Sequence, residues 1–185
     1  MNVALRLRMT VEQFLAWEEL QPERWEFDGF QPIAMVGRTE RHTVILGNIF
    51  VALRERLRGG PCRPYLEGLK IAAADSIRYP DVFVACGPTL GTATIANNPV
   101  VVFEVLSPNT TRTDVVVKNR EYRATPSIMR YVLVAQDGIG ITIYERRGED
   151  WLSTSISDPE ATLDMPEIQV SLPIASFYED VSFEP

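Results

Sequence analysis

The chain contains little cysteine and histidine, and this scarcity excludes several classes of site. Among its 185 residues are two cysteines and one histidine. Cys62 and Cys86 cannot complete a Cys/His zinc site with a single distant histidine. They also lack the CxxC spacing of redox motifs, so we expect them to form no disulfide framework. A reducing, cytoplasmic setting is then the default. A serine triad would have to recruit the same His42, and no spacing points to one.

Long apolar runs and nucleotide-binding loops are also missing. No apolar run approaches the roughly 20 residues of a membrane span. The start of the chain, Met1 to Met9, lacks the apolar region and the cleavage site of a signal peptide. There is no Gly-rich phosphate loop and no GxSxG nucleophile elbow. We therefore expect no membrane association, no P-loop chemistry and no α/β-hydrolase chemistry.

Positive charge is scarce as well. The chain has 18 lysines and arginines against 25 aspartates and glutamates, which gives a net charge of −7. This balance argues against a protein that coats nucleic acid through bulk electrostatics. It leaves open an enzyme that approaches DNA through a local patch and a bound cation. Hydrophobic residues at 45% and charged residues at 23% are ordinary for a folded domain.

The residue pattern predicts one α/β domain over residues 1–185, with a mixed β-sheet flanked by α-helices. A capping box starts a first helix at Thr10, and Asp28-Gly29 predicts a two-residue turn in a hairpin. The other predicted helices are Thr39–Arg58, Asp114–Ala124 capped by Thr113, and a short one opened by Pro173. The other predicted strands are Tyr65–Ala73, Tyr79–Cys86, Val100–Leu106, Tyr131–Ala135, Ile139–Glu145 and Trp151–Ile156.

Two of these strands carry a carboxylate in an apolar setting. Glu104 lies inside the run Val100–Leu106, where an unpaired carboxylate would cost several kcal/mol or have its pKa raised. Asp81 follows Pro80 at the entrance of the preceding apolar strand. If the strands are neighbours, the two acids can share a hard cation such as Mg²⁺, with Mn²⁺ as a substitute. The alternative is that each acid caps a loop or pairs with an arginine.

The helix after the second strand adds a lysine. Asp114, Lys118 and Tyr122 are spaced i, i+4 and i+8, so they share one face. If that face turns toward Glu104, Lys118 can orient or deprotonate a water, or stabilise charge on a phosphate. The alternative is a surface Asp114–Lys118 pair worth a few tenths of a kcal/mol.

Three further residues have two readings each. Alternation places Glu26 on the opposite side of its strand from Trp25 and Phe27, either as a third acid of the site or facing solvent. His42 lies on the apolar face of the long helix, as a hydrogen-bonded core residue or as a group that orients Glu26 or an attacking water. Lys70 is a rival to Lys118, and alternation does not decide whether it faces the acids.

Taken together, these motifs resemble the Uma family, which has a restriction-endonuclease-like fold within the PD-(D/E)XK nuclease superfamily. The resemblance runs from about Thr10 to about Glu145. Its residues are Glu26 in Trp-Glu-Phe-Asp-Gly, His42 at the start of a long helix, Asp81 in Tyr-Pro-Asp-Val, Glu104 in Glu-Val-Leu-Ser-Pro-Asn-Thr, and then Asp114, Lys118 and Tyr122.

The resemblance implies a metal-dependent endonuclease with a restriction-endonuclease-like core. Asp81 and Glu104 match the metal-binding acids, with the backbone carbonyl of Val105 as a further Mg²⁺ ligand, and Glu26 matches an additional acid. Leu106 replaces the lysine that the superfamily carries two residues after the second acid, and Lys118 is the matching position on the next helix. The expected substrate is a DNA phosphodiester.

Two alternatives to a DNA-cleaving enzyme stay open. One is a descendant that no longer cuts and instead binds nucleic acid or a protein partner. The other is a structural homodimer built on the hairpin strands near Ile139 and Trp151.

Overall fold

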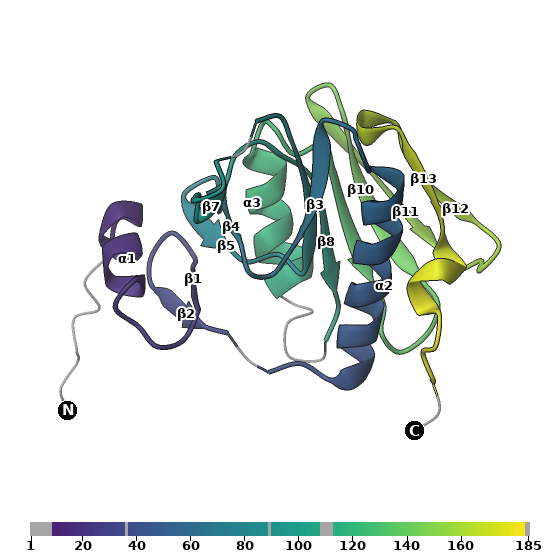
Figure 1. Ribbon diagram of the computed structural model, residues 1–185, viewed down its shortest axis with the longest axis horizontal. Coiled ribbons are helices and arrows are strands. Elements are labelled where there is room, and N and C mark those ends of the chain that lie inside the picture. Colours follow the sequence, from purple (N-terminus) through teal and green to yellow (C-terminus); the bar gives the residue numbers. More distant parts are fainter. Residues whose placement is uncertain (1–8, 36, 89, 108–112, 184–185) are drawn as a thin grey trace.

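Two β-sheets, between which the chain passes several times, organise the molecule (Figure 1). A computed structural model describes residues 9–35, 37–88, 90–107 and 113–183. Within these residues there is a six-stranded sheet, a five-stranded sheet and a two-stranded hairpin. The chain passes from the five-stranded to the six-stranded sheet at Tyr79 and Pro80, directly before Asp81.

The six-stranded sheet is mixed, as the sequence predicts. Its only parallel neighbours among the described strands are β8 and β9, and the other pairs are antiparallel. All seven residues of β8 are buried, which matches a central strand covered on both faces. In spatial order the strands are β11 (Asp150–Ile156), β10 (Ile141–Arg147), β9 (Arg130–Val134), β8 (Pro99–Val105), β6 (Val82–Cys86) and β3 (Cys62–Leu66).

The five-stranded sheet corrects one predicted strand. Tyr65–Ala73 is not continuous, because a turn after Leu66 sends its two halves into different sheets. The hairpin at Asp28 is present, but four residues join its strands because Phe27 pairs with Pro32. The Asp28 carboxylate accepts hydrogen bonds from two backbone N–H groups of this turn. The strands in order are β2 (Pro32–Ala34), β1 (Trp25–Phe27), β5 (Ser76–Arg78), β4 (Lys70–Ala73) and β7 (Ile95–Ala96).

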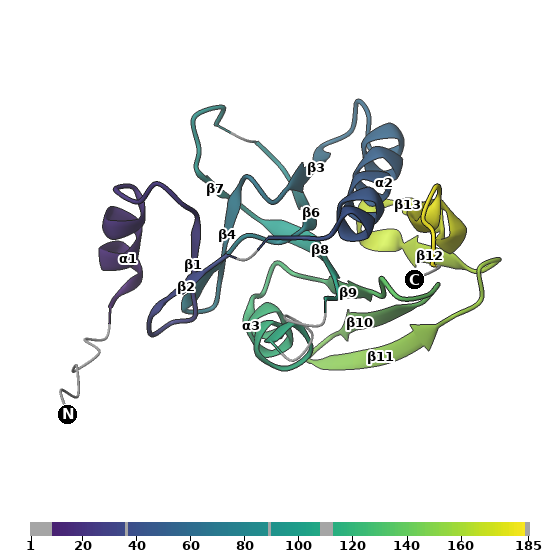
Figure 2. The same cartoon turned by 90° about the horizontal axis from the view of Figure 1, so that it is seen from below.

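Helices cover both faces of the six-stranded sheet (Figure 2). Helix α2 (Glu40–Arg56) and the hairpin β12 (Thr162–Met165) and β13 (Val170–Pro173) lie on one face, and α3 (Asn119–Ala124) lies on the other. The capping box at Thr10 is present at the start of α1 (Val11–Glu18). None of the helices in the described ranges is long and apolar enough to cross a membrane.

Two predicted helices differ in detail. The first turn of the Asp114–Ala124 helix is a π-helix, η1 (Thr113–Lys118), so Thr113 begins this π-turn and does not cap α3. Such wide turns occur often at functional sites. Pro173 is the N-cap of a 3₁₀-helix, η3 (Ile174–Tyr178), which follows another short one, η2 (Pro166–Ile168).

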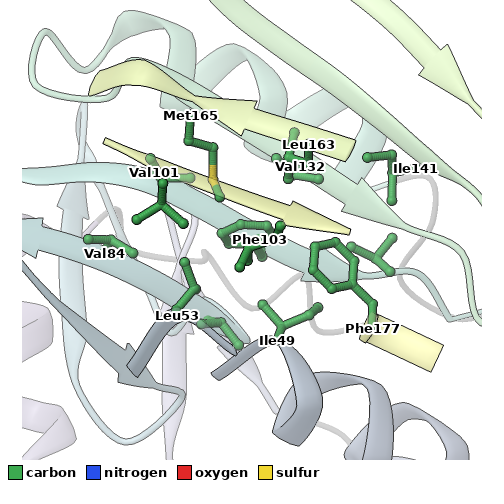
Figure 3. Packing of buried hydrophobic residues seen from close by; sticks show 14 of the residues in the cluster. Ile49, Leu53, Val84, Val101, Phe103, Val132, Ile141, Leu163, Met165 and Phe177 are labelled. Carbon is green, nitrogen blue, oxygen red and sulfur yellow. The ribbon is translucent and has the colours of Figure 1, made fainter. Parts of the chain in front are cut away.

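The main core lies between α2 and the sheet (Figure 3). Ile49 and Leu53 of α2 pack toward Phe103 of β8, and Phe177 of η3 contacts the Phe103 ring edge-to-face at 6.3 Å. A second cluster, on the α3 side of the sheet, contains Tyr122. Alternation along β8 therefore points Phe103 toward α2 and its neighbour Glu104 toward α3.

The two cysteines form no framework of several disulfides, but they do pair with each other. Cys62 and Cys86 occupy directly paired positions on β3 and β6, and a disulfide joins them. They are 24 residues apart in sequence, so their proximity depends on the register of the sheet and leaves no local spacing motif.

Candidate active site

The register of β6 and β8 brings Asp81 beside Glu104. Val82 pairs with Phe103 in this antiparallel pair, and the next residue in each direction is one of the two acids. The backbone N–H of Val105 donates to Asp81 Oδ2 at 2.7 Å. Both carboxylates are almost completely buried, with 2% of Asp81 and 3% of Glu104 exposed. The strands thus hold two acids next to each other out of bulk water.

Lys118 and Tyr122 both reach Glu104 from the helix that follows. Lys118 Nζ and the Tyr122 hydroxyl each donate to Glu104 Oε1 at 2.9 Å. Lys118 is buried and is therefore no solvated surface residue. Burial and the charge of Glu104 raise the pKa of Tyr122 well above its usual value, which keeps its hydroxyl a donor. The side chain of Asp114 lies outside the described residues.

Asp81 is held by a histidine and an arginine. His42 Nε2 lies 3.1 Å from Asp81 Oδ2, and Arg38 Nη2 lies 2.5 Å from Asp81 Oδ1. Burial alone would raise the pKa of Asp81, but the His42 hydrogen bond and the Arg38 charge outweigh it and lower that pKa. His42 Nδ1 is buried and has no hydrogen-bond partner among the described residues. His42 therefore belongs to this site and can offer a second ring nitrogen to a water or ligand.

Glu26 enters the site from the five-stranded sheet. It accepts hydrogen bonds from the backbone N–H of Tyr79 at 3.0 Å and from Arg78 Nη1 at 3.1 Å. Lys118 Nζ lies 3.6 Å from Glu26 Oε1, the oxygen that also accepts from Tyr79, and Glu26 is buried. The solvent-facing alternative is wrong, and Glu26 fixes the start of β6 as well as contributing charge.

A fully buried arginine organises this part of the site. Arg78 donates to both oxygens of Glu121 at 2.7 Å, from Nε and from Nη2. Desolvation opposes its charge, but Glu121 and Glu26 outweigh that cost and raise the pKa of Arg78 above its usual value. Glu121 also accepts a hydrogen bond from Ser76 at 2.8 Å. This bidentate geometry fixes α3 against β5 and thereby fixes Lys118 at the start of α3.

Lys70, the rival lysine, is engaged elsewhere. Its Nζ lies 2.6 Å from Glu18 Oε2 of α1, and the Tyr79 hydroxyl donates to the other oxygen of Glu18 at 2.8 Å. This buried contact fastens α1 to the segment that leads into Asp81.

Sequence reasoning missed four charged members of the site. Arg38 and Glu67 come from loops that carry no motif, and they form an ion pair with each other. Arg78 could have been identified from the sequence, because it is a charged residue inside the apolar stretch Ile77–Val84, two residues before Pro80. Glu121 had a weaker one, one residue before Tyr122 on a helix already assigned to the site.

The site carries an excess of negative charge, which suits a cation. Among the described side chains, five carboxylates face three permanent cations, so negative charge is in excess by two when His42 is neutral. The acids are Glu26, Glu67, Asp81, Glu104 and Glu121, and the cations are Arg38, Arg78 and Lys118. The described residues contain no group of three or more His, Cys, Asp or Glu side chains placed to hold a metal ion. Mg²⁺ is commonly held by one or two carboxylates with water and substrate phosphate, so the pair of Asp81 and Glu104 fits its donor chemistry.

Two bacterial proteins resemble this chain over nearly its whole length. The protein slr1290 of Synechocystis is 31% identical over 180 residues, which is 95% of this chain and 94% of that protein. A second Synechocystis protein, sll1609, is 25% identical over 176 residues, with 92% and 99% of the two chains covered.

A solved structure shares the fold. A crystal structure from Anabaena variabilis, described as "a putative nuclease", matches with a TM-score of 0.74 at 20% identity and covers 92% of this chain and 98% of that chain. The sequence model of the Uma2 family, described as "Putative restriction endonuclease", matches residues 11–175. The fold is thus that of a nuclease-like protein, and the chain belongs to the Uma2 family.

Proposed function

We propose that this protein is a Mg²⁺-dependent endonuclease that hydrolyses phosphodiester bonds of DNA. The observation that carries the proposal is the placement of Asp81 and Glu104 on adjacent strands with Lys118 Nζ 2.9 Å from Glu104. Burial of two neighbouring carboxylates is costly without function or pairing, and their cationic partners compensate the site incompletely. The family match supports a nuclease, while the ion and the substrate are part of the proposal.

Asp81, Glu104 and the backbone carbonyl of Val105 would hold the ion. Bound there, Mg²⁺ would supply charge neutralisation at the phosphate and would lower the pKa of an attacking water. The oxygen-only donor set favours Mg²⁺ or Mn²⁺ over softer metals.

The remaining side chains have roles that follow from their contacts. Lys118 lies beside Glu104 with an ammonium group that can stabilise charge developing on a phosphate oxygen. His42 is oriented by Asp81 through Nε2, so Nδ1 is left to accept a proton or a hydrogen bond from water. Tyr122 and Glu26 are positioning residues, because they hold Glu104 and Lys118 in place.

Calorimetric titration with Mg²⁺ and Mn²⁺ tests the proposal, followed by cleavage assays on duplex DNA, single-stranded DNA and RNA. The double variant Asp81→Asn, Glu104→Gln should lose both binding and cleavage while its circular dichroism stays native. Glu149→Gln is the matched control, since it removes a carboxylate from an exposed turn. Normal cation binding by the double variant, or no cleavage of any substrate by the wild type, would refute the assignment.

A second candidate function is binding without cleavage, to nucleic acid or to a protein partner. Two observations favour it: Leu106 stands where the superfamily has its lysine, and the carboxylate oxygens already have Arg38, His42, Lys118 and Tyr122 as partners. DNA binding that survives the double variant, together with no cleavage by the wild type, would establish this alternative.

A further inference from the structure

Arg38 stands between solvent and the buried Asp81 carboxylate. Its side chain is 24% exposed, whereas that of Asp81 is 3% exposed. Asp81 Oδ2 already accepts hydrogen bonds from Val105 and faces His42. The contact of Arg38 is to the other oxygen, Oδ1. A cation that approaches Asp81 therefore meets the position that the guanidinium now holds.

Arg38 also has a second carboxylate within reach. The same guanidinium forms an ion pair with Glu67, whose side chain is 35% exposed. Leu66 pairs with Val82 in the antiparallel β3–β6 pair. The next residue on each strand is Glu67 and Asp81, so these two acids lie opposite each other at the end of the pair. A guanidinium that leaves Asp81 can stay bound to Glu67 and needs no new partner.

Arg38 can leave its buried carboxylate more easily than Arg78 can. Arg78 is completely buried and donates three hydrogen bonds to two carboxylates. Arg38 belongs to the loop before α2, is partly exposed and bridges a buried acid to a half-exposed one. Displacing Arg78 would leave buried carboxylates without a cationic partner, which is costly. Displacing Arg38 frees the Asp81 carboxylate to bind a divalent cation in its place.

We propose that Arg38 is a displaceable counter-ion of the cation site: it neutralises Asp81 when no divalent ion is bound and withdraws to Glu67 when one binds. This inference rests on the proposed function, since it presupposes a cation at Asp81. The exchange keeps the buried carboxylate paired in both states. Its consequence is that Arg38 competes with the ion and weakens its binding.

Mn²⁺ titration by calorimetry at constant ionic strength tests the exchange. Arg38→Gln should bind Mn²⁺ about 10-fold more tightly than wild type, because a positive charge next to the site is removed. Arg54→Gln, at the exposed far end of α2, removes the same charge and should stay within about twofold of wild type, since screening is nearly complete over that length of helix. Equal or weaker binding by Arg38→Gln would overturn the exchange while leaving the proposed function intact.

A double-mutant cycle separates the exchange from a general charge effect. Glu67→Gln should weaken Mn²⁺ binding in the wild-type background, because the displaced guanidinium loses its acceptor. In the Arg38→Gln background the same change should have little effect. An equal loss in both backgrounds would mean that Glu67 acts only through its charge and would overturn the proposal. Absence of binding by wild type and all variants, with native circular dichroism, would overturn the proposed function as well.

Discussion

Replacing Arg78 by methionine should destabilise the protein by about 3–5 kcal/mol, the usual cost of breaking a buried ion pair from one side. The side chain is fully buried, and the substitution removes three charge-assisted hydrogen bonds, two to Glu121 and one to Glu26. Methionine fills much of the volume, so the loss comes mainly from two carboxylates left without their guanidinium. The backbone N–H of Tyr79 and Lys118 still face Glu26, which limits the damage on that side.

Urea unfolding at neutral pH measures the effect. With a slope of about 2 kcal/mol/M, the predicted loss lowers the midpoint by about 1.5–2.5 M. Arg54→Met is the control: it removes an arginine from the exposed end of α2 and should change the free energy of unfolding by less than about 0.5 kcal/mol. The double variant Arg78→Met, Glu121→Gln should recover part of the loss, because one of the stranded charges is also removed.

A loss below about 1 kcal/mol for Arg78→Met would place this arginine in the range of exposed ion pairs. A double variant that is no more stable than the single one would show that Glu121 is not the group left uncompensated. Either result would remove the basis for treating Arg78 as the group that fixes α3, and with it Lys118.

Tyr122, Asp81 and Phe177 each make a contact whose removal has a measurable effect. Tyr122→Phe removes a hydroxyl donor to Glu104 and should cost about 1.5–3 kcal/mol in urea unfolding, with a larger loss in cleavage if the carboxylate shifts. The pKa of Asp81 is lower in the folded state than in the unfolded chain. Its ionised form therefore adds stability above the unfolded pKa, and this contribution is lost as the pH falls through the folded pKa. Asp81→Asn should have a lower free energy of unfolding than wild type at neutral pH, and the difference should shrink in acid. Phe177→Ala should cost about 3–5 kcal/mol by opening a cavity against Phe103, and a cost under about 1 kcal/mol would contradict the packing in Figure 3.

Local patterns in the sequence were enough to place the main elements. The capping box at Thr10 and the helix after Thr39 follow from residues three to four positions apart, and both are present. The apolar run around Glu104 predicted a central strand, and β8 is buried along its length. Leu20 marks the limit of this reasoning: it extends the apolar spacing of α1, yet the helix ends at Glu18 and Leu20 is exposed.

The site could be predicted where its contacts follow from neighbouring strands or one helix face. Asp81 and Glu104 were expected together because each belongs to an apolar strand, and Lys118 and Tyr122 because they share a face one turn apart. The partners that come from other places in the chain could not be predicted in this way. Arg38 meets Asp81 only through the path of the loop before α2, and no spacing encodes that path.

The pairing of the two cysteines could not be predicted from the sequence either. Their disulfide depends on the register between β3 and β6, which a single sequence does not display. The division of Tyr65–Ala73 between two sheets is of the same kind, because its apolar pattern suits either one strand or two.

The parallel pairing of β8 with β9 has a consequence for synthesis of the chain. Residues of the site are spread from Glu26 to Tyr122, and β8 stays an edge strand until β9, Arg130–Val134, has left the ribosome. At 5–20 residues per second, the interval between completion of Glu26 and of β9 is roughly 5–20 s. At the start of this interval Glu26 has been made without Arg78, Tyr79 and Lys118, its neighbours in the folded chain. The nascent chain therefore has an exposed apolar strand until β9 is made. Tyr122 is the last of the site residues, so any activity begins only after about two thirds of the chain has been made.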